Sequence, residues 1–525
     1  MTQFRATYND GFKWQSCDGI FVKGYAFDPD QNYYEGKSLI NLFKSAESLG
    51  ELKELTNSLN GLFCAMGDLA WGMFALSDKC RSFPLFFSEI NGNITISDNP
   101  NTLIINNIIR EESVPSYLAT GYVIGNKTLF EGVVPIPSSS ILTIVENQPY
   151  ILEYYTFSTQ DLDHAAFDSA AKQLHHTLEG AMGRLLKSIG DRPIAVPLSG
   201  GYDSRFILTW LVSHGHKNIT AFSYGKENND DLNTAEKVAK VLGVRWIPIV
   251  YTNKMIDGFN NEPDFLPFCH YIAGATSMPI LQDYFAAREI VKRGLLSPDT
   301  VIIPGHSGDF IAGSHIAPHA IEICSTGEIV DEIYKHHYNI IPLPKQQELH
   351  EKQLLREGAN GKREIPFTII EDFNFKERQT KFIINASRAY SYFGFEFRLP
   401  LWDSELVGLF KRQPFDYRIK KKLYNEVILS HYFKPMQLIF VEDYKTEKAY
   451  GNLTKIKKSV KRMLPYWLLK LKSMPDNLNY KFITKILLSS PEMRRPSNLG
   501  RSTNAGITYW YYQVLLLPTN KKNKK

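Results

Sequence analysis

Cysteine is scarce in this chain, which holds five in 525 residues and no Cys-x-x-Cys pair. An odd number without that spacing argues against a disulfide framework and favours reduced thiols. Long apolar runs are also lacking: none approaches the ~18 residues that cross a bilayer, and the polar start from Met1 to Asp10 is not typical of a signal peptide. We therefore expect a cytoplasmic protein without a transmembrane helix.

The net charge is only +5, but it is unevenly distributed. Residues 451–525 hold 16 Lys and Arg against 2 Asp and Glu, whereas residues 1–450 hold 44 against 53. The acidic excess of the longer part gives no reason to expect a nucleic-acid partner. In the basic tail, Lys455 to Lys472 mixes basic residues with Leu, Trp and Tyr. This pattern leaves open a solvated capping extension or peripheral contact with an anionic membrane surface.

One stretch near position 200 is the most informative. An apolar run of strand character, Ile194–Leu198, meets two glycines, two serines and an aspartate, and a helix-compatible segment from Arg205 follows. Glycines allow backbone N–H groups to approach a phosphate without an intervening Cβ, and a helix start adds a positive dipole end. An aspartate there makes sense when a divalent cation bridges it to pyrophosphate. The sequence therefore predicts a nucleotide-phosphate site at Leu198, Ser199, Gly200, Gly201, Asp203 and Ser204.

The loop is not of the Walker type, because no Gly-Lys-Ser/Thr follows. Its Ser-Gly-Gly-x-Asp-Ser string resembles the ATP-pyrophosphatase family, whose members cleave ATP between the α and β phosphates and transfer AMP to a substrate. The resemblance implies ATP and Mg²⁺ as cofactors, with Asp203 as a metal ligand. It also implies that the end of the next strand holds the adenine through backbone groups, which makes Tyr224 a nucleotide-binding residue.

Apolar periodicity predicts a parallel sheet around this loop. Strands are expected at Ile219–Tyr224 and Val244–Val250, with a helix at Asp231–Leu242 between them and an amphipathic helix at Phe167–Ile189 before the loop. Strands that alternate with helices in this way form a doubly wound sheet, which binds ligands at the carboxyl ends of its strands. The phosphate loop and Tyr224 both fall at those ends.

A second glycine-rich turn follows the apolar run at 301–303. Its Gly305, Asp309 and Gly313 match the Ser-Gly-Glu-Gly-Ala-Asp-Glu-Leu-Phe-Gly-Gly pattern of asparagine synthetases. The resemblance implies that Gly305 contacts the nucleotide and that Asp309 is the second carboxylate on the magnesium, opposite Asp203. His306 and Phe310 stand where that family has two glutamates that act on the acceptor and its adenylate. Their loss argues that the acceptor is not simply free aspartate, and aspartate, a sugar uronate or another small acid stay open as substrates. His306 itself could equally be a hydrogen-bonded loop residue.

The N-terminal part resembles the glutaminase domain of asparagine synthetases. Leu59-Asn60-Gly61-Leu62-Phe63 and Pro84-Leu85-Phe86-Phe87 occur in the order and spacing of the family, among short alternating strands. The family nucleophile is a cysteine exposed as the new N-terminus, whereas Thr2 follows Met1 here. No Arg-Gly-Pro-Asp segment that would hold glutamine occurs between residues 30 and 60. Cys17, Cys64 and Cys80 are expected inside strands as buried residues. We expect an inactive glutaminase.

Three stretches elsewhere extend the likeness. The segment 275–279 resembles the one near the acceptor carboxylate, and Glu396 to Asp403 matches Glu-x-Arg-x-Pro-Phe-Leu-Asp, with Glu396 and Arg398 expected in a buried structural network. Family members also carry a lysine at the start of a later helix that reaches the ATP phosphates. Lys421 aligns best with it and Lys422 is the alternative, so the implied catalytic residues are Lys421, Asp309 and Asp203.

These observations predict an α/β protein with three parts. An Ntn-hydrolase-like, β-rich layered domain at 1–157 precedes a doubly wound parallel-sheet domain of the adenine-nucleotide α-hydrolase-like (PP-loop) type at 158–450, and a basic extension occupies 451–525.

The function implied is an ATP-dependent amide-forming ligase that adenylates a small-molecule carboxylate and transfers it to ammonia or an amine. The alternatives are an intramolecular cyclase of the β-lactam synthetase or lasso-peptide cyclase type and a non-catalytic nucleotide-binding subunit. A homodimer is left open.

Overall fold

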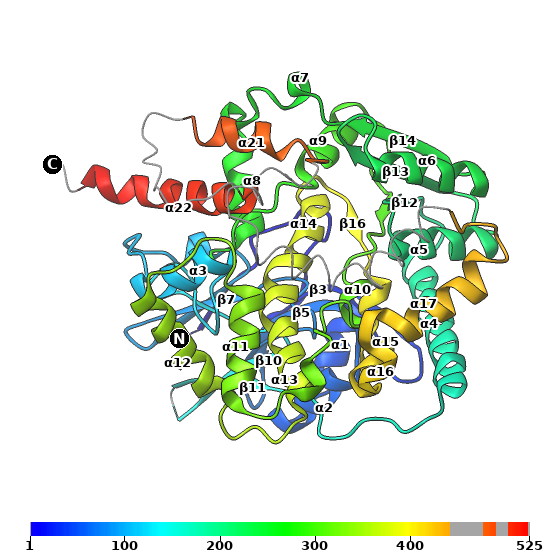
Figure 1. Cartoon of the computed structure of the whole chain (residues 1–525). Coiled ribbons are helices and arrows are strands. Elements are labelled where there is room, and N and C mark those ends of the chain that lie inside the picture. Colours follow the sequence, from blue (N-terminus) through cyan, green and yellow to red (C-terminus); the bar gives the residue numbers. More distant parts are fainter. Residues whose placement is uncertain (1, 147, 441–475, 490–501, 523–525) are drawn as a thin grey trace.

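The computed structural model describes residues 2–146, 148–440, 476–489 and 502–522. It is a mixed α/β structure, with a β-rich N-terminal region and a parallel sheet in the remainder (Figure 1). The fold class expected from the sequence is confirmed. The division at residues 157 and 450 stays a prediction. Within the described residues, no helix is both long enough and apolar enough to cross a membrane.

The N-terminal region is built from two sheets and a layer of helices. One sheet has the strand order β1-β8-β7-β9, and the other has the order β11-β10-β6-β5-β3-β2 with β4 paired to β3. Strands of the first are β1 (Thr2–Arg5), β7 (Phe86–Ile90), β8 (Asn93–Ser97) and β9 (Val134–Pro135); those of the second are β2 (Gln15–Cys17), β3 (Ile20–Phe27), β4 (Tyr33–Glu35), β5 (Asn60–Leu69), β6 (Gly72–Ser77), β10 (Ser140–Val145) and β11 (Gln148–Glu153).

Side chains that alternate between the two faces of the larger sheet contribute to two separate hydrophobic cores. On β5, Cys64 joins the core shared with the smaller sheet, while Phe63 and Ala65 face helices α1 (Lys37–Lys44) and α2 (Leu49–Ser58). A period of two sends successive side chains to opposite faces, so one strand serves both layers. The sequence analysis did not find these helices, nor α3 (Val114–Thr120). It also placed Cys80 in a strand; Cys80 is buried, but in the turn after β6, where Asp78 accepts its backbone N–H.

The second sheet is parallel, with the strand order β14-β13-β12-β15-β16. Its strands are β12 (Ile194–Pro197), β13 (Ile219–Gly225), β14 (Arg245–Val250), β15 (Val301–Ile302) and β16 (Glu396–Phe397); helices α4 (Phe167–Ile189), α5 (Tyr202–Ser213) and α6 (Asp230–Leu242) belong to the same unit. The chain leaves β12 toward β13 and β14 on one side and returns to β15 on the other. The strand order therefore reverses at β12, and ligands of such sheets bind at the carboxyl edge of that point.

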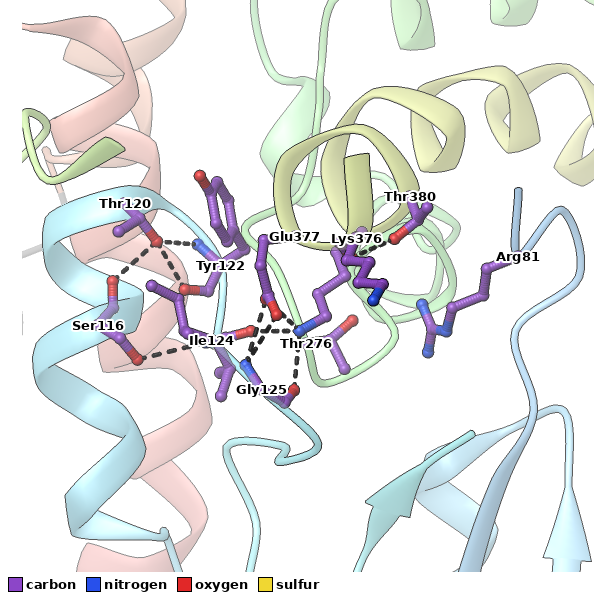
Figure 2. Close-up of polar contacts among 12 residues, drawn as sticks. Arg81, Ser116, Thr120, Tyr122, Ile124, Gly125, Thr276, Lys376, Glu377 and Thr380 are labelled. Atoms are coloured by element: carbon purple, nitrogen blue, oxygen red, sulfur yellow. Dashed lines mark hydrogen bonds and ion pairs between the residues drawn. The ribbon is translucent and has the colours of Figure 1, made fainter. Parts of the chain in front are cut away.

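A continuous helix crosses the middle of the molecule from α13 (Pro366–Phe373) through a π-helical segment η5 (Asn374–Ile383) to α14 (Ile384–Tyr392). Hydrogen bonds from η5 connect the N-terminal region to the part of the chain that holds the parallel sheet. Lys381 Nζ donates to the carbonyls of Val123 (2.9 Å) and Gly125 (2.8 Å), and Glu377 accepts the N–H of Gly125 at 3.1 Å (Figure 2). Lys381 and Glu377 also form an ion pair, so the charges in this contact are balanced.

Helices near the C-terminus pack against the part of the chain that holds the parallel sheet. They are α21 (Tyr480–Leu487) and α22 (Thr503–Lys522). His270 Nδ1 lies 2.9 Å from the Tyr511 hydroxyl, and Asn479 Nδ2 donates to Tyr251 O at 3.1 Å. These described segments therefore cap the parallel-sheet region. The basic stretch Lys455–Lys472, on which the expectation of membrane contact rests, lies outside the described residues.

Further elements complete the described chain. They are α7 (Asn253–Ile256), α8 (Phe265–Ala273), α9 (Tyr284–Lys292), α10 (Gly308–Ile311), α11 (Thr326–His337), α12 (Lys345–Ala359), α15 (Ser404–Arg412), α16 (Phe415–Arg418), α17 (Lys422–Ile428) and a second π-helical segment η8 (Leu429–Phe433), together with short 3₁₀ turns.

Candidate functional site

Two turns meet at the carboxyl edge of the parallel sheet. The first follows β12 and leads into α5, and the second follows β15, the neighbour of β12, and leads into α10. Their contact is close. A Cβ at Gly305 would lie 2.6 Å from Ser204 N, and a Cβ at Gly308 would lie 2.7 Å from Asp203 Cγ. Real Cβ atoms do not approach that closely, so glycine is required at both positions for the turns to meet.

The phosphate loop is held in place from both ends. Leu198 donates its N–H to Phe222 O (2.7 Å) and accepts the Ser223 hydroxyl on its carbonyl (2.6 Å), which ties the loop to β13. The Arg205 guanidinium donates to Gly200 O at 2.7 Å. These hydrogen bonds from Leu198 and Arg205 hold the backbone of the loop in place without a ligand.

The loop N–H groups make only loose contacts within the protein. Ser199 N–H donates to Ser204 Oγ at 3.1 Å, while Gly200 N–H reaches Asp231 Oδ1 and Gly201 N–H reaches Ser199 Oγ, each at 3.3 Å. Gly200 and Gly201 are half-buried and exposed, respectively. These donor–acceptor distances are long for hydrogen bonds. An anion at the helix start could therefore accept hydrogen bonds from the same N–H groups.

The two predicted metal ligands lie together. Asp203 Oδ1 is buried and has no hydrogen-bond partner among the described residues, and Oδ2 lies against Gly308. Burial, with the neighbouring Asp309 carboxylate, raises the pKa of Asp203 to about 6 against the opposing charge of Lys421. Burial also acts to raise the pKa of Asp309, but the hydrogen bond and charge of His315 and the charge of Lys421 outweigh it and lower that pKa to about 2.

This arrangement fits Mg²⁺. A buried carboxylate oxygen without a partner costs free energy unless a cation or donor satisfies it. The second carboxylate, of Asp309, is ionised and 49 % exposed. Magnesium takes oxygen ligands and commonly binds through one or two carboxylates plus substrate phosphates. Asp203 and Asp309 provide that set of ligands.

Lys421 is the lysine that faces these carboxylates. It immediately precedes α17 with a left-handed backbone (φ 59°). Its Nζ lies 5.9 Å from the ring centroid of Tyr202 and 5.7 Å from that of Tyr424. Lys422, the alternative, is exposed and lies over the ring of Phe167 at 4.9 Å. The geometry therefore favours Lys421 for contact with a phosphate at the loop.

Tyr224 presents its backbone, and not its side chain, to the edge of the sheet. Its hydroxyl donates to Asp283 at 2.6 Å, and its ring stacks on Tyr251 at 5.6 Å. Strand pairing with β12 ends at Phe222. A base at this edge would therefore meet main-chain groups of Ser223 and Tyr224.

The sequence analysis missed several residues that the structure adds to the site. Ser307 donates its hydroxyl to Gln379 at 2.9 Å, which joins the Asp309 turn to η5, and the buried Tyr424 hydroxyl lies beside the Asp203 carboxylate. His306 Nδ1 lies 2.8 Å from Ser387 Oγ. Only Tyr424 carried a signal, since it follows the lysine run within one helical turn; Gln379 and Ser387 depend on tertiary contacts.

Two cavities border the Asp309 turn. One of about 420 Å³ is lined by residues of the 278–283 segment together with His306 and Arg378. The other, of about 620 Å³, is lined by His315, α11 and η5. Arg378, Phe382 and Asn504 line both, so the two cavities adjoin. Met278 and Pro279, the end of the 275–279 segment expected near an acceptor, thus line a cavity that borders the Asp309 turn.

The part of the chain that holds Asp203, Asp309 and Lys421 matches a family model. Residues 173–429 match the model of the asparagine synthase family. No curated protein sequence matches the chain.

Matching solved structures include an NH₃-dependent NAD synthetase from Campylobacter jejuni, determined with nitrate (11 % identity, 28 % of this chain and 60 % of that one, TM-score 0.20). They also include a glutamine phosphoribosylpyrophosphate amidotransferase from B. subtilis, determined with ADP and GMP (10 % identity, 46 % of this chain and 74 % of that one, TM-score 0.19). The chain thus spans less than two thirds of the synthetase, and likeness at this level says nothing of shared activity.

The phosphate loop, the Asp309 turn and Lys421 all fall within residues 173–429, the part matched by the family model. Residues 173–429 therefore form a domain of the asparagine synthase family.

Proposed function

We propose that this protein is an ATP-dependent carbon–nitrogen ligase that activates a carboxylate by adenylation and transfers the acyl group to ammonia or an amine. The observation that carries the proposal is the convergence of Asp203, Asp309 and Lys421 beside a glycine loop at the switch point of the sheet. Two carboxylates and a lysine there suit a magnesium-bound pyrophosphate leaving group.

A carboxylate is a poor electrophile, and adenylation makes AMP its leaving group. The N–H groups of Gly200 and Gly201 would bind the β and γ phosphates, and Asp203 and Asp309 would hold Mg²⁺, which neutralises charge on the phosphates. Lys421 would stabilise the negative charge that develops as the acid attacks the α phosphorus. Fixed positions of these groups on α5, α10 and α17 reduce the entropy cost of the reaction.

Nitrogen is proposed to come from free ammonia or an amine. In the N-terminal region, Cys64 and Cys80 are buried, and burial raises the pKa of both thiols, so neither is a reactive thiolate. Thr2 lies in β1, paired in register with Ile94 of β8. These observations support the absence of glutamine hydrolysis.

Intramolecular cyclisation remains the second candidate, because the cavities beside Asp309 have room for a substrate that carries its own amine. A non-catalytic nucleotide-binding subunit is the third. It is disfavoured by the half-exposed, ionised Asp309 and by the left-handed backbone at Lys421, since a residue held in that conformation costs about 1–3 kcal/mol.

The test is ATP–pyrophosphate exchange over a panel of carboxylic acids, followed by amide formation with ammonium or glutamine. Exchange should require an acid, and amide should form with ammonium but not with glutamine. Lys421→Met should lower exchange by roughly 10²–10³-fold, whereas Lys422→Met should retain it. ATP binding without exchange for any acid would favour the non-catalytic subunit.

A further inference from the structure

Arg378 occupies an unusual position in the fold. It lies in the π-helical segment η5, and such segments are rare and often found at functional sites. Its neighbours in that segment are all engaged: Glu377 binds Gly125 N–H, Gln379 accepts from Ser307, and Lys381 donates to Val123 and Gly125. The Arg378 guanidinium has no hydrogen bond or ion pair with any residue that the structure describes.

This arginine stands where the two cavities meet. It lines both the cavity of about 420 Å³ and the one of about 620 Å³. Its charge also acts on Asp309, so it lies close to the predicted reaction centre. An unpaired, partly buried guanidinium with donors facing a cavity is suited to a carboxylate or phosphate, which it can bind through two parallel hydrogen bonds.

The larger cavity mixes apolar and polar side chains, and its charged groups are the acids Glu332 and Glu371 and the bases Lys335 and Arg378. His319, Lys335 and His336 surround the single carboxylate of Glu332 at 3.0, 3.2 and 2.7 Å. Its other acid, Glu371, is paired with buried Arg418. Asn339 and Asn374 add amide groups to the wall. Lys335 and both acids thus have partners, so Arg378 is the charged group of this wall that no described residue pairs and that remains for an anionic ligand.

The volumes decide how large that ligand is. Each cavity by itself falls in the range of about 300–1,000 Å³ that holds drug-sized ligands. A free amino acid would leave most of this space to water. The space is therefore matched by an acceptor that continues beyond the carboxylate being activated.

We propose that the acceptor is an elongated acid with a second anionic group, that Arg378 binds this group, and that the remote part of the molecule lies in the cavity along α11. The proposal rests on the ligase function above, because it assigns the acceptor of that reaction. It separates this chain from a ligase that takes a small free acid.

The test uses α,ω-dicarboxylic acids from succinate to sebacate, each paired with the monocarboxylic acid of equal length. Binding is measured by calorimetry in the presence of Mg²⁺ and α,β-methylene-ATP, and turnover by ATP–pyrophosphate exchange. We expect the longer diacids to bind about ten- to a hundredfold more tightly than their monoacid partners, the range of a hydrogen bond to a charged group. Arg378→Gln should remove this preference, and Arg356→Gln, at an exposed arginine on α12, should keep it.

Each outcome bears on a different claim. Diacid binding that depends on Arg378, without exchange, would support the acceptor site and count against the ligase function. Exchange that is equal for monoacids and diacids would support the ligase and overturn the acceptor proposal. Loss of diacid preference in Arg356→Gln, equal binding of both acid classes by the wild-type protein, or no acid binding at all would also overturn it.

Discussion

The Asp203 carboxylate lies against the backbone of Gly308, so close that a Cβ at position 308 would come within 2.7 Å of Asp203 Cγ and 2.5 Å of Leu401 Cδ1. Two turns far apart in the chain are thereby held in one site. The relationship makes Gly308 as necessary to the geometry as the charged residues beside it, although it contributes no functional group.

Replacement of Gly308 by alanine should therefore be costly. The added methyl must displace Asp203 or Leu401, and overpacking of this kind costs about 1–3 kcal/mol. We expect a lower denaturation midpoint in urea and loss of pyrophosphate exchange. Gly183→Ala, on the exposed face of α4 with no atom within 4 Å of the new Cβ, should instead stabilise the protein by up to about 1 kcal/mol. Normal exchange in Gly308→Ala would show that the two turns do not need this contact.

Asp203→Asn tests the metal role directly. The amide keeps the shape of the side chain but removes its charge, so exchange should fall by roughly 10²–10³-fold while the fold is kept. Circular dichroism and urea denaturation would establish the fold, and exchange assays over a range of Mg²⁺ concentrations would show the loss. Asp191→Asn, at an exposed position before β12, is the matched control. Wild-type exchange in Asp203→Asn would rule out the proposed ligand.

A buried ion pair between Arg418 and Glu371 lies next to α10, the helix that carries Asp309. Arg418, which is fully buried, pairs with Glu371 and donates to Ile311 O at 2.9 Å. Removal of one partner leaves an uncompensated buried charge, so Glu371→Ala should lower the free energy of unfolding by about 3–5 kcal/mol. Glu348→Ala, which breaks the partly exposed pairs of Glu348 with Lys345 and Lys352, should cost less than about 1 kcal/mol. Similar losses in the two variants would argue against a buried pair.

His337 should make stability depend on pH. It is buried on α11 with Nδ1 2.6 Å from the Tyr122 hydroxyl, and burial together with the charge of Arg378 lowers its pKa to about 3. Its neutral form is favoured by folding, so its contribution is complete above the unfolded pKa near 6.5 and is lost as the pH falls toward 3.

The corresponding measurement is urea denaturation at pH 8 and pH 5. His337 should account for about 2 kcal/mol of the stability lost between these values, because one pKa unit corresponds to about 1.4 kcal/mol. That part should disappear in His337→Gln and persist in His350→Gln, at an exposed histidine of α12. Equal pH dependence of wild type and His337→Gln would contradict the assignment.

The parallel sheet and its phosphate loop were predictable because their signals are local. Ile194–Leu198 followed by two glycines and a helix start determines a strand, a turn and a phosphate cradle within a few residues, and the structure has β12, the turn and α5 there. Asp309 and Lys421 were predicted from the family resemblance, and geometry now places them near Asp203. Their roles remain predictions.

What the sequence did not predict depends on long-range contacts. Helices α1 and α2 are short, and α2 has weak apolar periodicity. Because turn-forming residues surround them, the sequence analysis interpreted both segments as loops between strands. No local pattern distinguishes Arg378 from Glu377 or Gln379, since a π-helical turn arises from packing and not from composition. The two cavities beside the Asp309 turn form between segments near 280, 315, 378 and 504, which only the folded chain brings together.

The wider winding of η5 sets the directions of four side chains at once. Glu377 and Lys381 reach back to the N-terminal region, Gln379 steadies the turn that carries Asp309, and Arg378 points into the cavities. Deleting a single residue between 374 and 383 would restore ordinary α-helical winding and rotate these groups out of phase with their targets. The N-terminal region and the turn that carries Asp309 would then lose the contacts that they share with η5.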